Sequence, residues 1–540
     1  MYEKCIFVIG TLPTLIQGVY MKSLIAILSV LGLLCITGCK TVVVSKNGKW
    51  GSGTIKFEVS KTLNRVVYLV TAENSLYARE ITTDGPGKVV KIDSTYKDFL
   101  VSPDGQWVVY TRKGSTSFKN ELMAYNLKSN VKNLLATSGP AFVNKFISKD
   151  SKKVIFLVES NLTAVNLEDS KDVNVLDTGV VDFIASENGA YLSYVKYVPT
   201  SDAAELFSIN VVSNFAPNHI GQIGVSCKGR YSWEVEDFAK VTSLGQVFYV
   251  SKCDAFPQRG YTTSIRFDFV GDLYVYDPES KTSSEVAKNV FVSPFDGDNT
   301  MNPNPFRIKV SSNGTLVNYF QFEGSTGGSH SKNQYRAGIY STAKKKSQQI
   351  PTNTFATFNL GFSQQIVFSP DTKKILVTDN GALDFSIFDL NMKVLRNVQV
   401  ESQGVSNVGS VVFSSNSKSV LFLHDHVTQD RISWIKYDIE NDTLRRFELG
   451  RGLSGLQSKS LQFDSDPSQT ILFYGRYPEN RFFGSWQMDI YSWQQDQNNP
   501  KAVYTGFSSD MKDLKVLNQV ILYLWENKDG DKILSWMPIQ

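Results

Sequence analysis

The stretch FLVSPDGQWVVYTR at residues 99–112 consists of two short β-rich runs on either side of a compact polar turn. Valine, tyrosine, phenylalanine and tryptophan favour extended strands, whereas serine and aspartate side chains hydrogen-bond to nearby backbone in turns. Glycine accepts the positive φ angle that a tight hairpin needs. The stretch therefore predicts a β-hairpin.

The same pattern recurs along the chain. Further copies are FISKDSKKVIFLV at 146–158, FIASENGAYLSYVK at 183–196, IKVSSNGTLVNYF at 308–320, IVFSPDTKKILVTD at 366–379, VVFSSNSKSVLFLH at 411–424 and LQFDSDPSQTILFY at 461–474, with degenerate copies at 57–70 and 238–250. Most copies are followed by a third strand with a polar turn, as in ELMAYNLKSN at 121–130, and by a weaker fourth strand. Four-stranded antiparallel units repeating every 40 to 70 residues or so are typical of β-propeller blades.

The segment VSPDGQWVVY, Val101 to Tyr110, resembles the TolB-like propeller repeat, in which an F-S-P-D-G turn is followed by a β-branched and aromatic strand. IVFSPDTKKILV repeats it with Thr372 in place of glycine. The resemblance covers most of residues 51–540, although only two units keep Ser-Pro-Asp. It implies an all-β fold, a β-propeller of four-stranded antiparallel blades. Nine candidate units and a C-terminal half-unit predict about eight or more blades, in one large ring or in tandem propellers.

The C-terminal half-unit, QVILYLWENKDGDKILSW at 519–536, contains only two expected strands. Propellers commonly close by pairing strands from opposite ends of the chain. We therefore expect either TVVVS at 41–45 or the strand near Phe57 to supply the missing pieces.

Residues 21–40, MKSLIAILSVLGLLCITGCK, have the form of an export signal. Lys22 precedes an uncharged stretch from Ser23 to Gly38 that is too short to span a bilayer comfortably. The tetrad ITGC resembles the bacterial lipobox, in which the thiol accepts a diacylglyceryl group and the new amino terminus is acylated, often with palmitate. The resemblance implies a lipoprotein signal peptide at 1–38, lipidation of Cys39 and a tether at 39–50. Met21 is a better start than Met1, because residues 1–20 fit no signal pattern.

Several acyl chains on one cysteine hold a domain at a membrane without a spanning helix. Lys40 follows Cys39 where an aspartate would retain the protein in the inner membrane under the enterobacterial sorting rule. We expect the protein in the bacterial cell envelope, at the outer membrane and facing the periplasm. The alternative is an uncleaved anchor or a short core helix that happens to contain cysteines.

Composition narrows the class of partner. Removal of the signal peptide removes Lys4, Lys22 and Glu3, so the mature chain has 54 basic and 51 acidic side chains and is nearly neutral. Proteins that bind nucleic acid usually carry a basic face or stripe, so nucleic acid is not an expected partner.

The chain has five cysteines. Processing removes Cys5 and Cys35 and lipid takes Cys39, which leaves Cys227 and Cys253. Two thiols in an oxidising periplasm are expected to form a disulfide, the alternative being two separately buried cysteines.

No catalytic motif stands out: G-x-S-x-G, H-E-x-x-H and P-loop patterns are absent, and the chain has four histidines. His424 and His426 in LFLHDHV would point to one side of a strand, as two metal ligands can, but no third ligand is evident. The acidic turns at 295–302 and 527–532 lack the downstream glutamate of a calcium loop. We therefore expect no metal and no cofactor.

Long insertions lie on the face opposite the short Ser-Pro-Asp turns. They occupy residues 251–272, 291–306, 321–338 and 475–486, and the first three are neighbours in the ring. They are rich in the arginine and aromatic residues that dominate interface hot spots. The candidate partner-binding residues are Arg259, Tyr261, Tyr335, Arg336, Arg476, Tyr477 and Arg481. The alternative is that the insertions are merely tolerated at the surface.

These observations favour a non-enzymatic, lipid-anchored envelope protein that uses one propeller face as a scaffold for a protein or polymer partner. The alternative is a propeller enzyme, a hydrolase or lyase acting on peptide or glycan in the periplasm, with carboxylates as acid and base.

Overall fold

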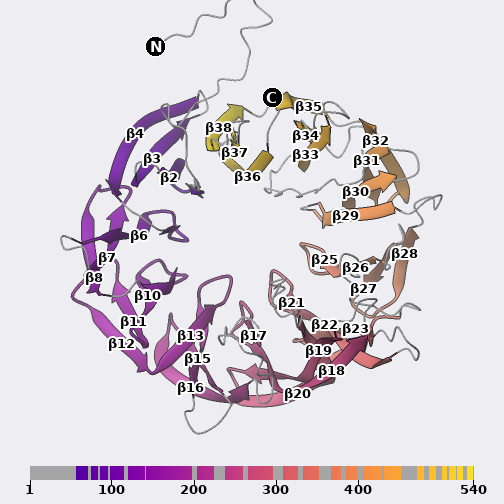
Figure 1. The fold of residues 1–540 in the computed structure, drawn as a ribbon, viewed down its shortest axis with the longest axis horizontal. Helices are drawn as coiled ribbons and strands as arrows, with labels where there is room; N and C mark the ends of the chain where they lie inside the picture. Colours follow the sequence, from indigo (N-terminus) through magenta and orange to yellow (C-terminus); the bar gives the residue numbers. More distant parts are fainter. Residues whose placement is uncertain are drawn as a thin grey trace, which may run out of the picture.

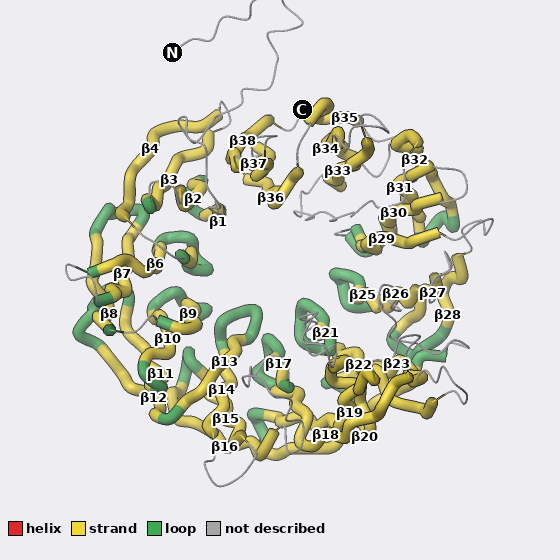
Figure 2. Tube along the Cα trace, viewed as in Figure 1, coloured by secondary structure: helices red, strands yellow, loops and turns green. Residues whose placement is uncertain are grey.

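The structure is a computed structural model of the 540-residue chain. It describes residues 56–70, 74–82, 85–94, 98–114, 119–139, 142–197, 204–223, 238–259, 265–295, 308–325, 333–351, 366–378, 385–398, 406–414, 416–426, 431–451, 471–478, 486–493, 501–507, 510–517, 520–526 and 532–538. Within these ranges every regular element is a strand (Figure 2). No helix among them is long and apolar enough to cross a membrane.

The described strands form ten units, numbered in chain order, around one ring with a central opening (Figure 1). Units 1 to 4 consist of β1 (Lys56–Ser60), β2 (Arg65–Val70), β3 (Ser75–Thr82) and β4 (Gly85–Ser94); β5 (Phe99–Val101), β6 (Trp107–Lys113), β7 (Asn120–Asn126) and β8 (Lys132–Ser138); β9 (Val143–Ile147), β10 (Lys153–Val158), β11 (Asn161–Asn166) and β12 (Val173–Thr178); and β13 (Val180–Ala185), β14 (Tyr191–Tyr197), β15 (Ala204–Asn210) and β16 (Asn214–Ile223). Units 5 to 8 consist of β17 (Ala239–Val241), β18 (Val247–Arg259), β19 (Ile265–Asp277) and β20 (Thr282–Phe295); β21 (Lys309–Val310), β22 (Leu316–Ser325), β23 (Asn333–Ser341) and β24 (Lys346–Gln349); β25 (Ile366–Phe368), β26 (Lys374–Thr378), β27 (Phe385–Asp389) and β28 (Val394–Val398); and β29 (Ser406–Phe413), β30 (Ser419–His426), β31 (Arg431–Asp438) and β32 (Thr443–Arg451). Unit 9 has β33 (Ile471–Pro478), β34 (Trp486–Trp493) and β35 (Lys501–Phe507), and unit 10 has β36 (Asp510–Leu517), β37 (Val520–Glu526) and β38 (Lys532–Pro538).

The sheets are antiparallel, and the first strand of each four-stranded unit lies nearest the opening. The expected all-β propeller is confirmed, as a single ring and not as tandem propellers (Figure 1). Units 5 and 6 merge into one eight-stranded sheet through the pairing of Val290 with Gln321.

The hydrophobic core is divided among the interfaces between neighbouring units. Val67 and Leu69 of β2, for example, pack in one buried cluster with Val108 and Tyr110 of β6. Alternating apolar residues on both sides of each sheet supply these interfaces, as expected of strands covered on two faces. The chain can therefore exceed the usual size of a single core.

The repeated turn is built by its serine and its aspartate. Ser102 Oγ donates to Asp104 Oδ1 at 2.6 Å and accepts the N–H of Trp107 at 2.8 Å, while Asp104 Oδ1 also accepts the N–H of Gln106. Gly105 has a φ of 72°. The turns that begin at Ser148, Ser186, Ser311, Ser369 and Ser414 repeat the serine contacts, with aspartate or asparagine as the partner.

In some turns another residue occupies the glycine position, and the structure shows how that residue is tolerated there. Ser151, Thr372 and Ser417 adopt positive φ angles of 57°, 54° and 60°. Ser151 Oγ accepts the backbone N–H of Asp104 in the preceding unit at 3.0 Å, and Ser417 Oγ accepts that of Asp371 at 3.0 Å. A hydrogen bond to the neighbouring turn thus offsets the strain of a non-glycine residue in this conformation.

Gly245 offers a test of this packing between turns. It has a φ of 81°, and a Cβ there would lie 2.4 Å from Tyr191 Cε1 of the preceding unit. Gly179 has a similar φ of 70° with no atom within 4 Å of its Cβ position. We expect Gly245→Ala to destabilise the protein by about 3 kcal/mol, against about 1 kcal/mol for the matched control Gly179→Ala. Thermal unfolding measures both, and equal shifts would contradict the interlocking of turns.

The closure of the ring differs from the expectation. Unit 10 has three described strands and not two, because β36, just upstream in the chain, supplies its inner strand. The strand near Phe57 is β1, the inner strand of unit 1, and its one partner among the described strands is β2. The other expected partner, TVVVS at 41–45, lies outside the described residues.

Units 10 and 1 pack side by side at the seam (Figure 1). Leu517 and Leu522 share a buried cluster with Phe57 and Tyr68. Lys515 Nζ donates to Glu58 Oε2 at 2.7 Å and to the carbonyl of Phe57 at 3.0 Å. Packing and charge therefore join the two ends of the described ring.

Candidate interaction face

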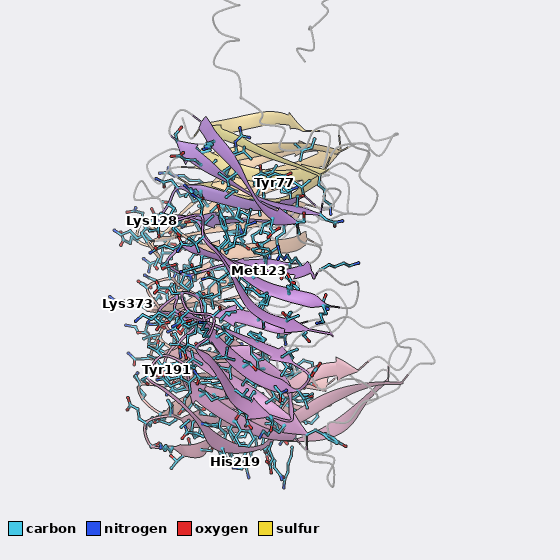
Figure 3. All side chains as sticks on the ribbon, turned by 90° about the vertical axis from the view of Figure 1, so that its left-hand side faces the viewer. Tyr77, Met123, Lys128, Tyr191, His219 and Lys373 are labelled. Carbon is cyan, nitrogen blue, oxygen red and sulfur yellow. The ribbon has the colours of Figure 1, made fainter. Side chains whose placement is uncertain are left out.

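The ring has two unlike faces. The turns between first and second strands and between third and fourth strands lie on one face, here named the turn face. Figure 3 shows Lys128, Tyr191 and Lys373, which belong to or adjoin such turns, on the same side of the ring. The opposite face, here named the extended face, carries the hairpin ends of the second and third strands and the links between units.

Units 5 and 6 project from the extended face. Strands β18, β19 and β20 have 13, 13 and 14 residues, whereas the short inner strand β17 pairs only with Val247–Tyr249 of β18. Beyond it β18 and β19 continue as a paired ribbon to Arg259 and Ile265. Figure 3 shows these strands projecting on the side away from Lys373. We name residues 253–271 and 290–295 the arm.

The structure brings part of the predicted binding face together. Arg259 ends β18 in the arm, and Arg336 lies in β23 opposite Gln321, in the same eight-stranded sheet. Arg476 and Tyr477 lie in β33 of unit 9, opposite Met488 and Gln487. The first three predicted insertions are thus neighbours, and the fourth is separate.

The other predicted site residues give no side-chain geometry. Tyr261, Arg481, Cys39 and Cys227 lie outside the described residues. The backbone of Cys253 lies in β18 opposite Gly271. Because Cys227 lies outside the described residues, the disulfide between the two cysteines stays a prediction.

Tyr335 is a correction to the predicted face. Its side chain is fully buried between Phe291 and Phe322, with ring centroids 4.9 and 5.7 Å away. The next residue, Arg336, points to the other side of the strand: it is half-exposed, with Nε 3.7 Å from Glu323 Oε1 and Nη1 donating to Gln349 at 3.1 Å. The alternation of strand side chains explains why neighbours in sequence have opposite environments.

Charged pairs link the inner strands across several units. Lys515 pairs with Glu58, and Lys56 pairs with Asp98 at 2.7 Å, while Lys145 lies 3.7 Å from the same aspartate. Burial alone would raise the pKa of Asp98, but the hydrogen bond from Lys56 and the charge of Lys145 outweigh it and lower that pKa. An ionised, paired carboxylate of this kind is poorly suited to general acid catalysis.

Nearer the rim, two interfaces carry a clasp that sequence reasoning missed. Tyr194 Oη donates to Asp177 Oδ2 at 2.5 Å, and Lys196 Nζ donates to Asp177 Oδ1 at 2.5 Å, joining β14 to β12 of the preceding unit. Tyr110 and Arg112 bind Asp93 in the same way, joining β6 to β4. The sequence signal for this clasp is Tyr-x-Lys or Tyr-x-Arg on the second strand of a unit. Sequence alone does not distinguish this pattern from other strand ends, because the aspartate partner lies in the preceding unit.

The clasp predicts a pH dependence of stability. Burial would raise the pKa of Asp177, but hydrogen bonds from Lys196 and Tyr194 lower it below 3.8. The folded carboxyl binds its proton less tightly than the unfolded one, so its contribution is present above about pH 4 and is lost as the pH falls through the folded pKa. The pKa of Tyr194 is raised above 10.0 by burial and by Asp177, so its contribution is lost only in strong alkali.

We therefore expect Asp177→Asn to lower the thermal midpoint clearly at about pH 7 and less at about pH 3, because below the ordinary carboxyl pKa the unfolded chain binds the proton more tightly than the folded one and the contribution of the ionised carboxyl declines. Tyr194→Phe should cost about 1 kcal/mol at neutral pH. A difference between wild type and Asp177→Asn that is the same at both pH values would contradict the role of the ionised carboxyl.

The described residues include no cluster of three or more metal-ligating side chains. His424 and His426 lie in β30 opposite Val408 and Ser406. The acidic turns 295–302 and 527–532 fall almost wholly outside the described residues.

No protein-family model matches the chain, and no curated protein is significantly similar to it in sequence. The solved structures that are similar to it include a eukaryotic initiation factor (TM-score 0.39, 13% identity, 74% of this chain and 89% of that one); the dipeptidyl peptidase 4 of Porphyromonas gingivalis (0.42, 9%, 92% and 67%); and the tricorn protease (0.22, 12%, 93% and 62%). These distant likenesses assign no activity. The TolB-like resemblance rests on the repeated turn.

Proposed function

We propose that this protein is a non-enzymatic, lipid-anchored component of the bacterial cell envelope, whose propeller presents its extended face to a protein or polymer partner. The observation that carries the proposal is the arm. It extends a single sheet past the inner strand on one face, whereas the described turns of the opposite face are short.

The hydrogen bonding of the two faces supports this choice. On the turn face, Asn188 Nδ2 donates to the carbonyl of Ser243 in the next unit, and Asn313 Nδ2 donates to Thr372 Oγ1. Polar groups that already hydrogen-bond to the neighbouring turn are less available to bind a partner. The polar side chains of the turn face are thus best explained as groups that stabilise the fold.

The membrane is the second proposed partner. Lipidation at Cys39 would hold the propeller at the outer membrane, facing the periplasm, because several acyl chains together bind a bilayer strongly. The lipid would restrict the search for a partner to the envelope and raise the effective concentration of the face there.

The experiment uses the mature, tagged protein in detergent-solubilised envelopes. We expect affinity capture to retain a partner whose mass is unchanged after long incubation with the protein. The enzyme alternative predicts a captured peptide or glycan that is shortened or modified. Mass spectrometry of the partner before and after incubation separates the two, and a chemically altered partner would overturn the scaffold proposal.

A further inference from the structure

Exposed charges are distributed unevenly over the turn face. In units 6 and 7, the turns of this face and the first residue of each following strand include five exposed lysines, here named the lysine patch: Lys344, Lys345, Lys346, Lys373 and Lys393. Asp371 is the one exposed acid in the described part of these turns. Figure 3 shows Lys373 on the turn-face side of the ring.

The other described units do not share this excess of positive charge. The corresponding residues of units 5 and 8 include two exposed lysines and three exposed acids: Lys281, Lys418, Glu279, Glu440 and Asp442. Those of units 1 to 4 mix six exposed lysines with four exposed acids: Lys61, Lys128, Lys132, Lys149, Lys152 and Lys171, and Asp150, Glu168, Asp169 and Glu187. The lysine patch is therefore the strongly cationic part of the described turn face.

The aspartates between these lysines are used within their own turns. Asp371 Oδ1 accepts the backbone N–H of Lys373 at 3.0 Å. Asp389 Oδ1 accepts the backbone N–H groups of Asn391 and Lys393 at 2.8 and 2.9 Å. The carboxylates therefore bind backbone, while the lysine side chains are exposed to solvent.

Most of the lysine ammonium groups are available to an outside ligand. Lys346, Lys373 and Lys393 form no ion pair with a described residue. Lys345 Nζ lies 2.9 Å from Asp277 Oδ2, but its side chain is 69% exposed. Ion pairs as exposed as this one are weak, so it does not prevent the lysine from taking another anionic partner.

We propose that the lysine patch contacts the surface of a bilayer that contains anionic phospholipids. Lysines near such a surface are attracted by its negative potential, which falls off within a Debye length, about 8 Å at physiological ionic strength. Lysine is depleted at the centres of protein–protein interfaces, and Val394 is the one exposed large aliphatic residue in the described turns of units 6 and 7. The composition of the patch thus fits lipid headgroups better than a protein.

This contact goes beyond the proposed function and does not depend on lipidation of Cys39. A few lysines bind a bilayer weakly at physiological ionic strength, so the patch orients an anchored protein and does not hold a free one. With the membrane on the side of the turn face, the extended face points away from it and is open to a partner.

Vesicle sedimentation of the full mature chain carrying Cys39→Ser tests the patch without acyl chains. At a salt concentration of about 20 mM, where screening is weak, we expect vesicles of equal parts phosphatidylglycerol and phosphatidylcholine to bind the protein at least about tenfold more tightly than phosphatidylcholine vesicles do. Salt at about 0.5 M should abolish the difference. Equal binding to both vesicles, or binding to neither, would overturn the proposal.

Paired variants locate the contact on the ring. Lys346→Glu with Lys393→Glu should weaken binding to the anionic vesicles at least about tenfold, whereas Lys346→Arg with Lys393→Arg should keep it. The matched control, Lys128→Glu with Lys152→Glu, makes the same change in net charge at exposed turn-face positions of units 2 and 3 and should have little effect. All three double variants should keep the thermal midpoint of unfolding, since the four side chains are exposed.

Two outcomes of these variants would contradict the assignment. An equal loss of vesicle binding in the control would show that net charge and not the lysine patch is responsible. Wild-type vesicle binding by Lys346→Glu with Lys393→Glu, together with loss of a captured envelope protein, would show that the patch binds an acidic protein segment instead of a bilayer.

Discussion

Replacing Cys39 by serine is expected to release the protein from the membrane fraction and to abolish its labelling with a fatty-acid probe. Each buried CH₂ of an acyl chain contributes about 0.8 kcal/mol, so the loss of several chains removes essentially all membrane affinity.

The matched control is Cys35→Ser, four residues upstream in the same apolar stretch. That cysteine should leave with the signal peptide, so its replacement should keep both labelling and membrane association. Equal labelling of wild type and Cys39→Ser would show that the lipobox reading is wrong. Recovery of the wild type in the inner membrane would contradict only the sorting expectation based on Lys40.

Charge reversal on the extended face is expected to weaken partner capture at least about tenfold. Arginines at interface centres commonly contribute 2 kcal/mol or more. Arg259 and Arg336 lie in one sheet, so Arg259→Glu and Arg336→Glu should act on one contact, and Arg476→Glu in unit 9 on a separate one. Arg336→Glu also places a like charge near Glu323, but this exposed pair is worth less than about 1 kcal/mol to the fold.

Lys373→Glu is the matched control, because Lys373 is an exposed charge on the turn face. It should leave capture unchanged. Changes at Asp104, Asn313 and Asp371 should lower the unfolding midpoint, since these side chains hold their turns. Loss of capture without unfolding in the turn-face set would contradict the assignment of faces.

The hairpin repeat could be predicted from sequence because its information is local. Ser102, Asp104 and Gly105 make the contacts that their side-chain chemistry predicts, and the strands beside them follow β-propensity. Even the replacement of glycine by Ser151 or Thr372 keeps the turn, because a hydroxyl takes over a contact with the neighbouring unit.

The features that could not be predicted from sequence depend on how segments far apart in the chain pair and pack. Tyr335 and Arg336 both looked like interface residues, and only the register of β23 shows that the tyrosine faces the core. The third strand of unit 10, β36, was missed because DMKDLKVL mixes charged and apolar residues without a turn signal. Asp177 lies 17 residues before Tyr194, so their clasp appears only when two units are placed side by side.

The most direct test of the extended face as the partner-binding surface is photo-crosslinking in living cells. A photoreactive amino acid is placed in turn at Arg259, Arg336, Lys128 and Lys373. The account predicts a discrete crosslinked envelope partner from positions 259 and 336 and none from 128 and 373, which lie on the turn face. Crosslinks from positions 128 and 373 alone would show that the partner binds the turn face and would contradict the account.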